Sequence, residues 1–166
     1  MDAALRRYIE ALEAALGDPR RGLPEDVFRL VSRITPLVNV DLLIKDDRAR
    51  TLLTWRDDEF FGPGWHVPGG IIRFKESAAD RIRACARAEL GADIASQPSP
   101  LFVLEDIGTE DTRGHHISLL YRCRLLGVPD PAREAVSDPP RSGRWRWHDR
   151  CPPDLLAEQA AYARFF

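Results

Sequence analysis

Apolar residues recur at helical spacing near the start of the chain. They repeat every three or four positions, at Leu5, Tyr8, Ile9, Leu12 and Leu16. Gly17 ends this pattern, so we expect a first helix over residues 5–16. A second helix is predicted over residues 24–35, where a proline occupies the first turn and Pro36 ends the helix.

Further along the chain, the pattern changes to short apolar and β-branched runs, which predict strands. The first two runs, residues 36–47 and 49–57, flank an Asp-Asp-Arg turn and are expected to form a β-hairpin. Another helix is predicted from Ser77 to Leu90, because Ser77 is a suitable cap and a glycine follows Leu90. The remaining expected elements are strands over residues 101–107, 115–126 and 145–149, and a last helix that bears Leu155, Leu156, Tyr162 and Phe165.

This order mixes strands with a few helices and lacks a regular alternation of strand and helix. It predicts an α+β fold in which helices flank a mixed β-sheet. A chain of 166 residues can bury one proper core. We therefore assign residues 1–27 to an N-terminal helical extension and residues 28–166 to a single main domain.

Charge and composition exclude several classes of protein. The chain has 24 Lys and Arg against 26 Asp and Glu, and its arginines are scattered between acids, so we expect no nucleic-acid partner. It has no apolar run that could span a bilayer and no signal-like start, so we expect no membrane partner and a cytoplasmic location. The cysteines are odd in number and far apart, and we expect Cys85, Cys123 and Cys151 to be free thiols.

The helix predicted over residues 77–90 carries a carboxylate on its apolar side. On a helical wheel, Glu89 falls within an arc formed by Ala78, Ala79, Ile82, Cys85, Ala86 and Leu90. An ionised carboxylate is costly there unless it is paired or bound to a cation. Glu89 is therefore either bonded to a nearby arginine or backbone amide, or it is a metal ligand.

The loop before this helix favours a metal ligand. Residues 62–70 read GPGWHVPGG, and the pair Gly69 and Gly70 lets backbone carbonyls approach a ligand closely. A carbonyl that faces a carboxylate suits a hard divalent cation such as magnesium, which completes its shell with waters and phosphate oxygens. Glu76, just before the helix, is expected to orient this loop or to reach the metal through water.

Residues 68–92, which read PGGIIRFKESAADRIRACARAELGA, resemble the signature of the Nudix hydrolase superfamily. The glycine and glutamate positions of that signature fall in register at Gly70, Glu76, Glu89 and Gly91. Its Arg-Glu pair and the first of its paired glutamates are replaced by Ala84, Cys85 and Ala88. The resemblance implies an α/β/α sandwich, the Nudix fold, over residues 28–166, with Glu89 as the chief metal carboxylate that remains.

Within this superfamily, the chain is most similar to the GDP-mannose mannosyl hydrolases, over roughly residues 28–150. In that branch, a loop glycine carbonyl, here Gly69, and the last glutamate of the signature, here Glu89, hold one magnesium ion; manganese is the alternative metal. Water attacks the sugar carbon, and the metal stabilises charge on the departing diphosphate. The resemblance therefore implies a hydrolase that releases sugar and nucleoside diphosphate from a small-molecule nucleoside diphosphate substrate.

The same resemblance implies roles for residues outside the signature. Asp41 and Arg56 match positions that contact the nucleotide or the diphosphate, and His116 matches a histidine near the leaving phosphate. Arg141 lies in a long loop and is suited to the diphosphate as a bidentate donor. The expected catalytic residues are thus Glu76, Glu89 and His116, and the expected substrate-binding residues are Asp41, Arg56 and Arg141.

Three positions depart from this branch. The arginine that follows the glycine pair is Ile71 here, and the family's metal-binding glutamine and general-base histidine align with Arg141 and Ser142. A neutral serine cannot replace imidazole as a base near pH 7 without a helper. Two alternatives to the leading reaction therefore stay open. The first is attack at phosphorus, with a base drawn from Glu76, His116 or the acidic segment 57–59, and the second is a catalytically inactive module that binds a nucleotide sugar.

A homodimer is also expected from the resemblance. The apolar stripe of the first helix is predicted to pack either on the main domain or on a second subunit.

Overall fold

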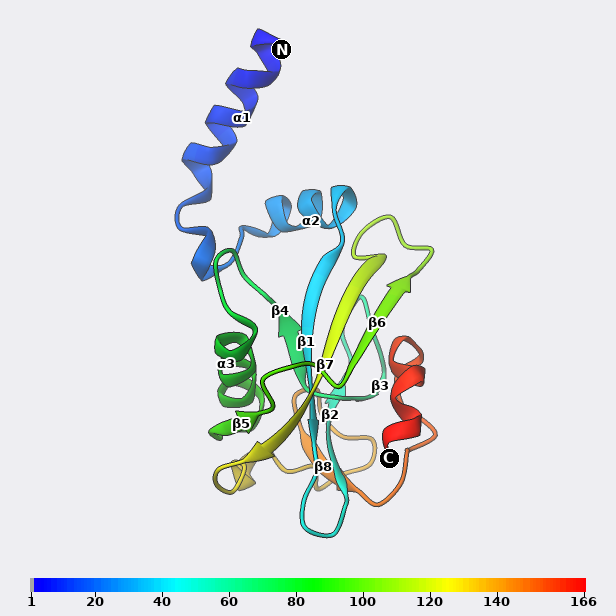
Figure 1. The fold of residues 1–166 in the computed structure, drawn as a ribbon. Coiled ribbons are helices and arrows are strands. Elements are labelled where there is room, and N and C mark those ends of the chain that lie inside the picture. The colour runs from blue at the N-terminus through cyan, green and yellow to red at the C-terminus, as the bar shows by residue number, and fades with distance from the viewer. Residues whose placement is uncertain (1) are drawn as a thin grey trace.

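The computed structural model describes residues 2–166, in which two β-sheets lie between helices (Figure 1). The helices are α1 (Ala3–Leu16), η1 (Pro19–Arg21), α2 (Glu25–Ile34), α3 (Ala78–Leu90), η2 (Pro131–Arg133) and η3 (Ala157–Phe165), where η marks a 3-10 helix. The strands are β1 (Leu37–Ile44), β2 (Thr51–Arg56), β3 (Gly64–His66), β4 (Gly69–Ile71), β5 (Ile94–Ser96), β6 (Phe102–Ile107), β7 (His115–Leu125) and β8 (Trp145–His148). The expected α+β fold with a mixed sheet and an additional N-terminal helical segment is confirmed.

The larger sheet forms the centre of the fold. Its strands run in the order β4-β1-β7-β5, and β6 also pairs with β7. β1 pairs in parallel with β7, from Leu37 opposite His116 to Ile44 opposite Cys123, and antiparallel with β4. Because β1 is bonded on both sides, most of its residues are buried, and these include the polar residue Asp41.

The expected hairpin between β1 and β2 is wrong. The chain does reverse after β1, where the Asp46 amide donates to the Arg50 carbonyl at 3.1 Å. Pairing nevertheless stops at a single bridge between Lys45 and Thr51. Both edges of β1 are occupied by β4 and β7, so β2 joins a second sheet with the order β3-β2-β8.

The glycine-rich segment at residues 62–70, expected to be a loop, contains two short strands. β3 pairs with β2 of the smaller sheet, and β4 pairs with β1 of the larger sheet. The chain therefore crosses from one sheet to the other within a few residues. This crossing places Gly69 and Gly70 beside Asp41 and Val40 in the middle of β1. The structure also contains β5, a short strand after α3 that the sequence pattern does not predict.

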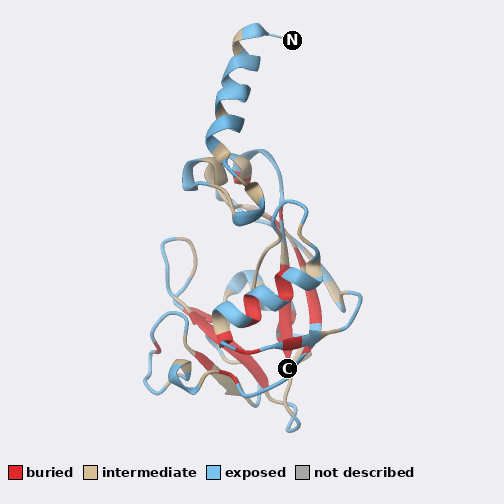
Figure 2. Cartoon of the chain, turned by 90° about the vertical axis from the view of Figure 1, so that its left-hand side faces the viewer, coloured by how far each residue is buried: buried red, intermediate tan, exposed pale blue. Residues whose placement is uncertain are grey.

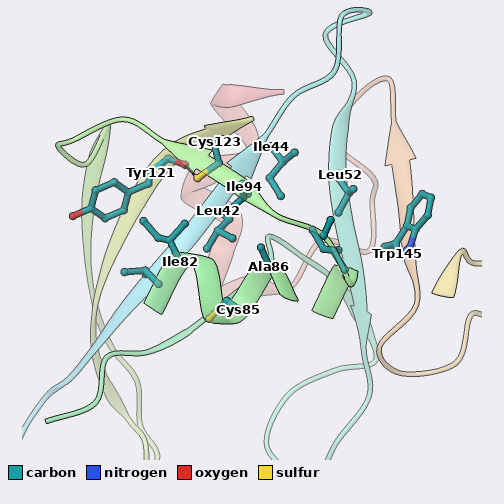
Figure 3. Packing of buried hydrophobic residues seen from close by; sticks show 13 residues of the cluster. Leu42, Ile44, Leu52, Ile82, Cys85, Ala86, Ile94, Tyr121, Cys123 and Trp145 are labelled. Atoms are coloured by element: carbon teal, nitrogen blue, oxygen red, sulfur yellow. Dashed lines mark hydrogen bonds between the residues drawn. The ribbon is translucent and has the colours of Figure 1, made fainter. Parts of the chain in front are cut away.

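Helix α3 begins and ends where its sequence predicts. Ser77 caps the first turn, and Gly91 takes the left-handed conformation that ends the helix, with a φ of 63°. Ile82 and Ala86 face the larger sheet and belong to one cluster with apolar residues of β1, β2, β7 and β8 (Figure 3). The helix therefore covers one face of this sheet with a close-packed apolar layer.

Two residues of α3 depart from the predicted wheel. Ala79, expected on the apolar face, is exposed, and Arg81 is buried. Arg81 is tolerated inside because its guanidinium pairs with the Glu76 carboxylate, at 2.7 Å between Nη2 and Oε2. The buried face of the helix is therefore rotated toward the loop that precedes it.

A second apolar cluster lies between the two sheets and η3. Its buried members are Leu43, Leu53, Trp55, Trp65, Val67, Leu120 and Tyr162. The expected last helix is present as a 3-10 helix that begins at Ala157, after Leu155 and Leu156. Tyr162 is fully buried, and η3 lies across the strands from α3 (Figure 1).

Helix α1 projects away from the rest of the protein (Figure 1), and none of its described residues is buried (Figure 2). Three of its apolar residues are exposed, with relative exposures of 52% for Leu5, 74% for Tyr8 and 44% for Ile9, and Leu12 and Leu16 are partly exposed. The first expectation, packing on the main domain, is therefore not observed in a single chain, and packing on a second subunit stays a prediction. The proposed boundary between residues 27 and 28 falls inside α2.

Cys85, Cys123 and Cys151 are free thiols, and the first two are buried. Across the described part of the chain, none of the helices has both the length and the apolar character that a bilayer crossing requires.

Candidate active site

A cleft opens where the chain crosses between the two sheets. Its lining comes from β1, from the end of β2 and the loop after it, from the segment that contains β3 and β4, from β6, β7 and the loop between them, and from η3. Four of the predicted site residues line it, namely Asp41, Arg56, Gly69 and His116. A fifth residue, Glu89, reaches the cleft from α3, because its carboxylate is bonded to the Gly69 amide.

The carboxylate of Glu89 is held on both oxygens. Oε1 accepts from the Gly69 amide at 2.9 Å, and Oε2 accepts from the Thr54 hydroxyl at 2.9 Å. Burial and, to a smaller extent, the negative charge of Asp41 raise the pKa of Glu89 to about 7, against the opposing effects of the two hydrogen bonds and the positive charge of Arg56. Both interpretations of Glu89 are thus compatible with the structure: it bonds a backbone amide, and it is a partly buried carboxylate, with a side chain that is 25% exposed, that a cation would stabilise.

The backbone of Gly69 is turned toward the cleft. Pro68 accepts a hydrogen bond from Leu42 at 2.8 Å, and Ile72 donates one to Val38 at 2.9 Å. In an antiparallel pair, residues alternate between facing the partner strand and facing away from it. Gly69 lies one residue after Pro68, so its N–H and its carbonyl both point away from β1, which leaves the carbonyl free for a ligand.

The carboxylate of Asp41 lies beside Gly69. A Cβ atom at Gly69 would lie 2.5 Å from Asp41 Oδ1 and 2.4 Å from the Val40 carbonyl, so only glycine fits. Asp41 is 5% exposed, and its Oδ2 accepts from the Tyr162 hydroxyl at 2.6 Å. Burial raises the pKa of Asp41 to about 6, against the opposing effect of the hydrogen bonds from Tyr162 and Ser118.

These oxygen atoms match the ligands that magnesium prefers. The carboxylates of Glu89 and Asp41 and the carbonyl of Gly69 are all hard oxygen donors, and the two carboxyl groups are disfavoured as free anions by burial. Within residues 2–166 there is no group of three or more His, Cys, Asp or Glu residues that could hold a metal by themselves. The site thus fits an ion held by one or two carboxylates, with waters and substrate phosphates as its other ligands.

Two arginines line the same cleft. Arg56 Nε donates to Asp58 at 2.5 Å, and its guanidinium lies 4.5 Å from the centre of the Phe61 ring. Arg113, from the loop between β6 and β7, lies 5.2 Å from the same ring. The cleft therefore contains one buried and one partly buried carboxylate suited to a cation, and arginines suited to phosphate oxygens.

Two histidines of the cleft are neutral near pH 7. Burial lowers the pKa of His116, and the positive charge of Arg113 lowers it further. Burial lowers the pKa of His66 to about 4, and its Nε2 lies 3.1 Å from the Thr54 hydroxyl and 3.7 Å from Glu89 Oε2. The imidazole of His116 can therefore accept a proton or a hydrogen bond, whereas His66 Nε2 donates to the Thr54 oxygen, because the Thr54 hydroxyl proton is donated to Glu89.

Comparisons with known proteins place this architecture. No family model matches the sequence. The Low-salt glycan biosynthesis protein Agl8 of Haloferax volcanii is 34% identical over 112 residues, which cover 64% of this chain and 70% of that protein. A Jonesia denitrificans structure described as a possible asymmetric diadenosine tetraphosphate hydrolase has a TM-score of 0.62 at 20% identity, and the match covers 80% of this chain and 92% of that one. A MutT NUDIX hydrolase from Burkholderia pseudomallei has a TM-score of 0.59 at 24% identity, with 78% and 97% covered.

The chain belongs to the Nudix hydrolase superfamily. The solved structures are similar in fold, and the relative from Haloferax volcanii extends the similarity to sequence. This membership agrees with the resemblance carried by Gly70, Glu76, Glu89 and Gly91.

Two predicted residues lie outside the cleft of this Nudix chain. Glu76 Oε2 accepts from the Arg73 amide at 2.9 Å and from Arg81 Nε at 2.8 Å, so it fastens the loop before α3 to the helix. Arg141 is exposed in the loop before β8 and does not line the cleft. Beside it, the Ser142 hydroxyl accepts from the Asp57 amide at 3.4 Å. The structure thus brings together Asp41, Arg56, Gly69, Glu89 and His116, and leaves Glu76 and Arg141 outside.

Several residues of the Nudix cleft were not predicted. His66 directly precedes the VPGG segment, and this position was the only local signal that could have identified it. Asp106, Arg113 and Glu158 come from β6, from the loop after it and from η3, and they meet only when the sheets and η3 come together. Gln159 accepts from the Val67 amide at 2.7 Å and so fixes the sheet crossing to η3.

Proposed function

We propose that the protein is a magnesium-dependent hydrolase of a nucleoside diphosphate sugar that releases the sugar and the nucleoside diphosphate. The observation that carries this proposal is the pairing, in one cleft, of the partly buried carboxylate of Glu89 and the buried carboxylate of Asp41 with Arg56 and Arg113. A diphosphate bound with a divalent cation needs both kinds of group. The name of the Haloferax volcanii relative refers to glycan biosynthesis, a process that consumes nucleotide sugars, and supports the same substrate class.

The residues of the cleft have different roles in the proposed reaction, and each role follows from the chemistry of the side chain or backbone group. The Gly69 carbonyl and the Glu89 carboxylate would hold the metal, which when bound acts as a Lewis acid toward the leaving diphosphate. Arg56 binds the diphosphate oxygens, and its contact with Asp58 and Phe61 fixes the direction of its guanidinium. Thr54 and the Gly69 amide orient the Glu89 carboxylate.

The proton of the attacking water requires a base other than Ser142. Asp106 and Glu158 line the cleft and are the carboxylates that we propose for this role. We expect Asp106→Asn or Glu158→Gln to lower kcat by roughly 100-fold or more for the residue that is the base. The other substitution should leave kcat within a few-fold of the wild type.

One observation favours a second reaction, attack at phosphorus. His116 is a neutral imidazole in the same cleft as Arg56 and Arg113, the groups suited to phosphate. A base beside the phosphates suits water that attacks phosphorus, and the products would then be sugar phosphate and nucleoside monophosphate.

Product analysis tests the proposal. The protein is incubated with magnesium and a panel of nucleotide sugars, including GDP-mannose and GDP-glucose, and the products are separated by chromatography. Sugar and nucleoside diphosphate would support the leading reaction, and sugar phosphate and nucleoside monophosphate would support attack at phosphorus. Binding without turnover of any substrate would contradict hydrolysis and indicate a nucleotide-sugar-binding module. Glu89→Gln serves as the control, because it should abolish metal-dependent turnover in either reaction.

A further inference from the structure

The loop between β6 and β7 contributes an arginine to the cleft. Arg113 lines the cleft with Arg56 and His116, and its loop lies beside α2 (Figure 1). Both side chains line the cleft, and the positive charge of Arg113 lowers the pKa of the His116 imidazole. Arg113 is therefore placed where a ligand of the cleft would meet it, although it lies far in sequence from the glycine-rich segment.

Three aromatic rings surround the Arg113 guanidinium. Its central carbon lies 4.8 Å from the ring centre of Phe60, 5.2 Å from that of Phe61 and 5.5 Å from that of Phe28. Aromatic faces stabilise a guanidinium and restrict its orientation, but they do not satisfy its N–H donors. The rings thus hold a cation in place and leave its hydrogen-bonding edge available.

The donors of Arg113 lack an acceptor within the described chain. Nε is buried without a hydrogen-bond partner, and no ion pair is formed to this side chain in residues 2–166. Buried donors without partners are rare because they lose their bonds to water.

The acids whose charges act on Arg113 are bonded elsewhere. Asp58 accepts from Arg56 at 2.5 Å, and Glu25 and Glu59 accept from Arg29 at 2.8 and 2.9 Å. These acids are therefore committed to other arginines, and an anion from outside the protein is the natural acceptor for Arg113.

We propose that Arg113 binds a phosphate oxygen of the nucleoside diphosphate and is a second phosphate-binding arginine of the cleft. The identity of the anion rests on the proposed function. Ile71, which follows the glycine pair, also lines the cleft and is apolar, so it supplies no charge from that side. Arg113 compensates from another loop, with its donors directed by Phe28, Phe60 and Phe61.

Calorimetric binding measurements test this assignment without turnover. GDP, UDP, ADP and inorganic pyrophosphate are titrated, with magnesium, into the wild type, Arg113→Gln, Arg113→Lys and Arg124→Gln. Arg124 is an exposed arginine of β7 outside the cleft and serves as the matched control. We expect Arg113→Gln to raise the Kd of the bound diphosphate roughly 10- to 100-fold, the range for a lost charge-assisted hydrogen bond. Arg113→Lys should give a smaller loss, because it keeps the charge but not the planar fork. The control should bind as the wild type does.

The outcomes separate this inference from the proposed function. If no nucleotide sugar is hydrolysed but diphosphate binding still depends on Arg113, the inference stands and the proposed function fails. If nucleotide sugars are hydrolysed and neither Kd nor KM changes in Arg113→Gln, the inference fails and the proposed function stands. Absence of any diphosphate binding by the wild type would also overturn the inference. A thermal melt of each variant, by circular dichroism, restricts these comparisons to folded protein.

Discussion

Glu89 has its two oxygens bonded and still carries an electrostatic strain. Its hydrogen bonds from Gly69 and Thr54 do not offset burial and the nearby charge of Asp41, so the charged carboxylate is disfavoured near pH 7. A divalent cation bound as proposed would relieve this strain by giving both carboxylates a positive partner. We therefore expect the same side chain to be destabilising in the metal-free protein and stabilising in a metal-bound one.

The metal-free protein should lose stability as the pH rises from about 5 to about 8. The folded-state pKa values of Glu89 and Asp41 are raised to about 7 and about 6, above their ordinary values of 4.5 and 3.8. The folded state therefore holds these protons more tightly, and that stabilisation is lost as the pH passes through about 6 to 7. Thermal melts in a chelator across this range measure the effect.

Magnesium should raise Tm more at about pH 8 than at about pH 5.5, because it binds the ionised carboxylates. Glu89→Gln should raise the chelator-treated Tm at the higher pH and abolish the magnesium-dependent gain. A magnesium-dependent gain that persists in this variant would contradict the assignment of Glu89 as a metal ligand.

Gly69→Ala should destabilise the protein by roughly 2–4 kcal/mol and abolish turnover. The added Cβ would lie 2.4 Å from the Val40 carbonyl, and β1 is bonded on both sides and cannot move away. Gly127→Ala is the matched control, since nothing lies within 4 Å of a Cβ there. Denaturant unfolding compares the two variants, and equal stabilities would show that the close approach at Gly69 is not required.

Among the elements, those specified by nearby residues were predicted best. α3 is fixed by a serine cap and a glycine stop, and both signals lie within the helix or next to it. The β1–β2 hairpin was wrong because pairing partners are chosen by the whole sheet, and β7 and β4 occupy both edges of β1. β3 and β4 were missed because glycine and proline mask short strands that are stabilised by their neighbours.

A hydrogen bond from the Tyr162 hydroxyl to Asp41 joins η3 to the cleft, and deletion of the hydroxyl oxygen removes it. Tyr162→Phe deletes the hydroxyl that donates to Asp41 at 2.6 Å, and we expect a loss of about 1–3 kcal/mol because Asp41 stays buried. Tyr8→Phe, on exposed α1, should be neutral. Urea unfolding of both variants measures the difference, and a neutral Tyr162→Phe would mean that the bond to Asp41 does not stabilise η3 and that its apolar packing and the Gln159 hydrogen bond hold it.

At the scale of the whole molecule, the sequence predicted the half of the site that lies in one segment. Gly69 and Glu89 are twenty residues apart and share a signature, so their meeting could be anticipated. Arg113 and Gln159 belong to segments without any local motif, and only the assembled sheets and η3 bring them to the cleft. The spacing of apolar residues along the sequence does not predict that these residues lie close together, because their proximity depends on tertiary contacts.

The exposed apolar face of helix α1 suggests how two copies of the chain associate. Because its apolar stripe has no partner within one chain, we expect a homodimer in solution that depends on α1. Sedimentation of the full chain and of residues 17–166 measures this. The shortened chain should be monomeric and should keep its Tm, since no residue of α1 is buried. A dimer that survives the deletion would place the interface elsewhere.

The walls of the cleft are joined by contacts between residues far apart along the chain. Asn39 and Ser118 are separated by 79 positions, Val67 and Gln159 by 92, and Asp41 and Tyr162 by 121. During synthesis on the ribosome, β1 and the glycine-rich segment emerge long before η3. We therefore expect a nascent chain to expose Glu89 and Asp41 to water, where their carboxyl groups would keep ordinary pKa values and would not hold a metal tightly. The cleft is complete only when residues 159–162 have left the exit tunnel, so we expect any metal or substrate to bind after synthesis of the chain and not during it.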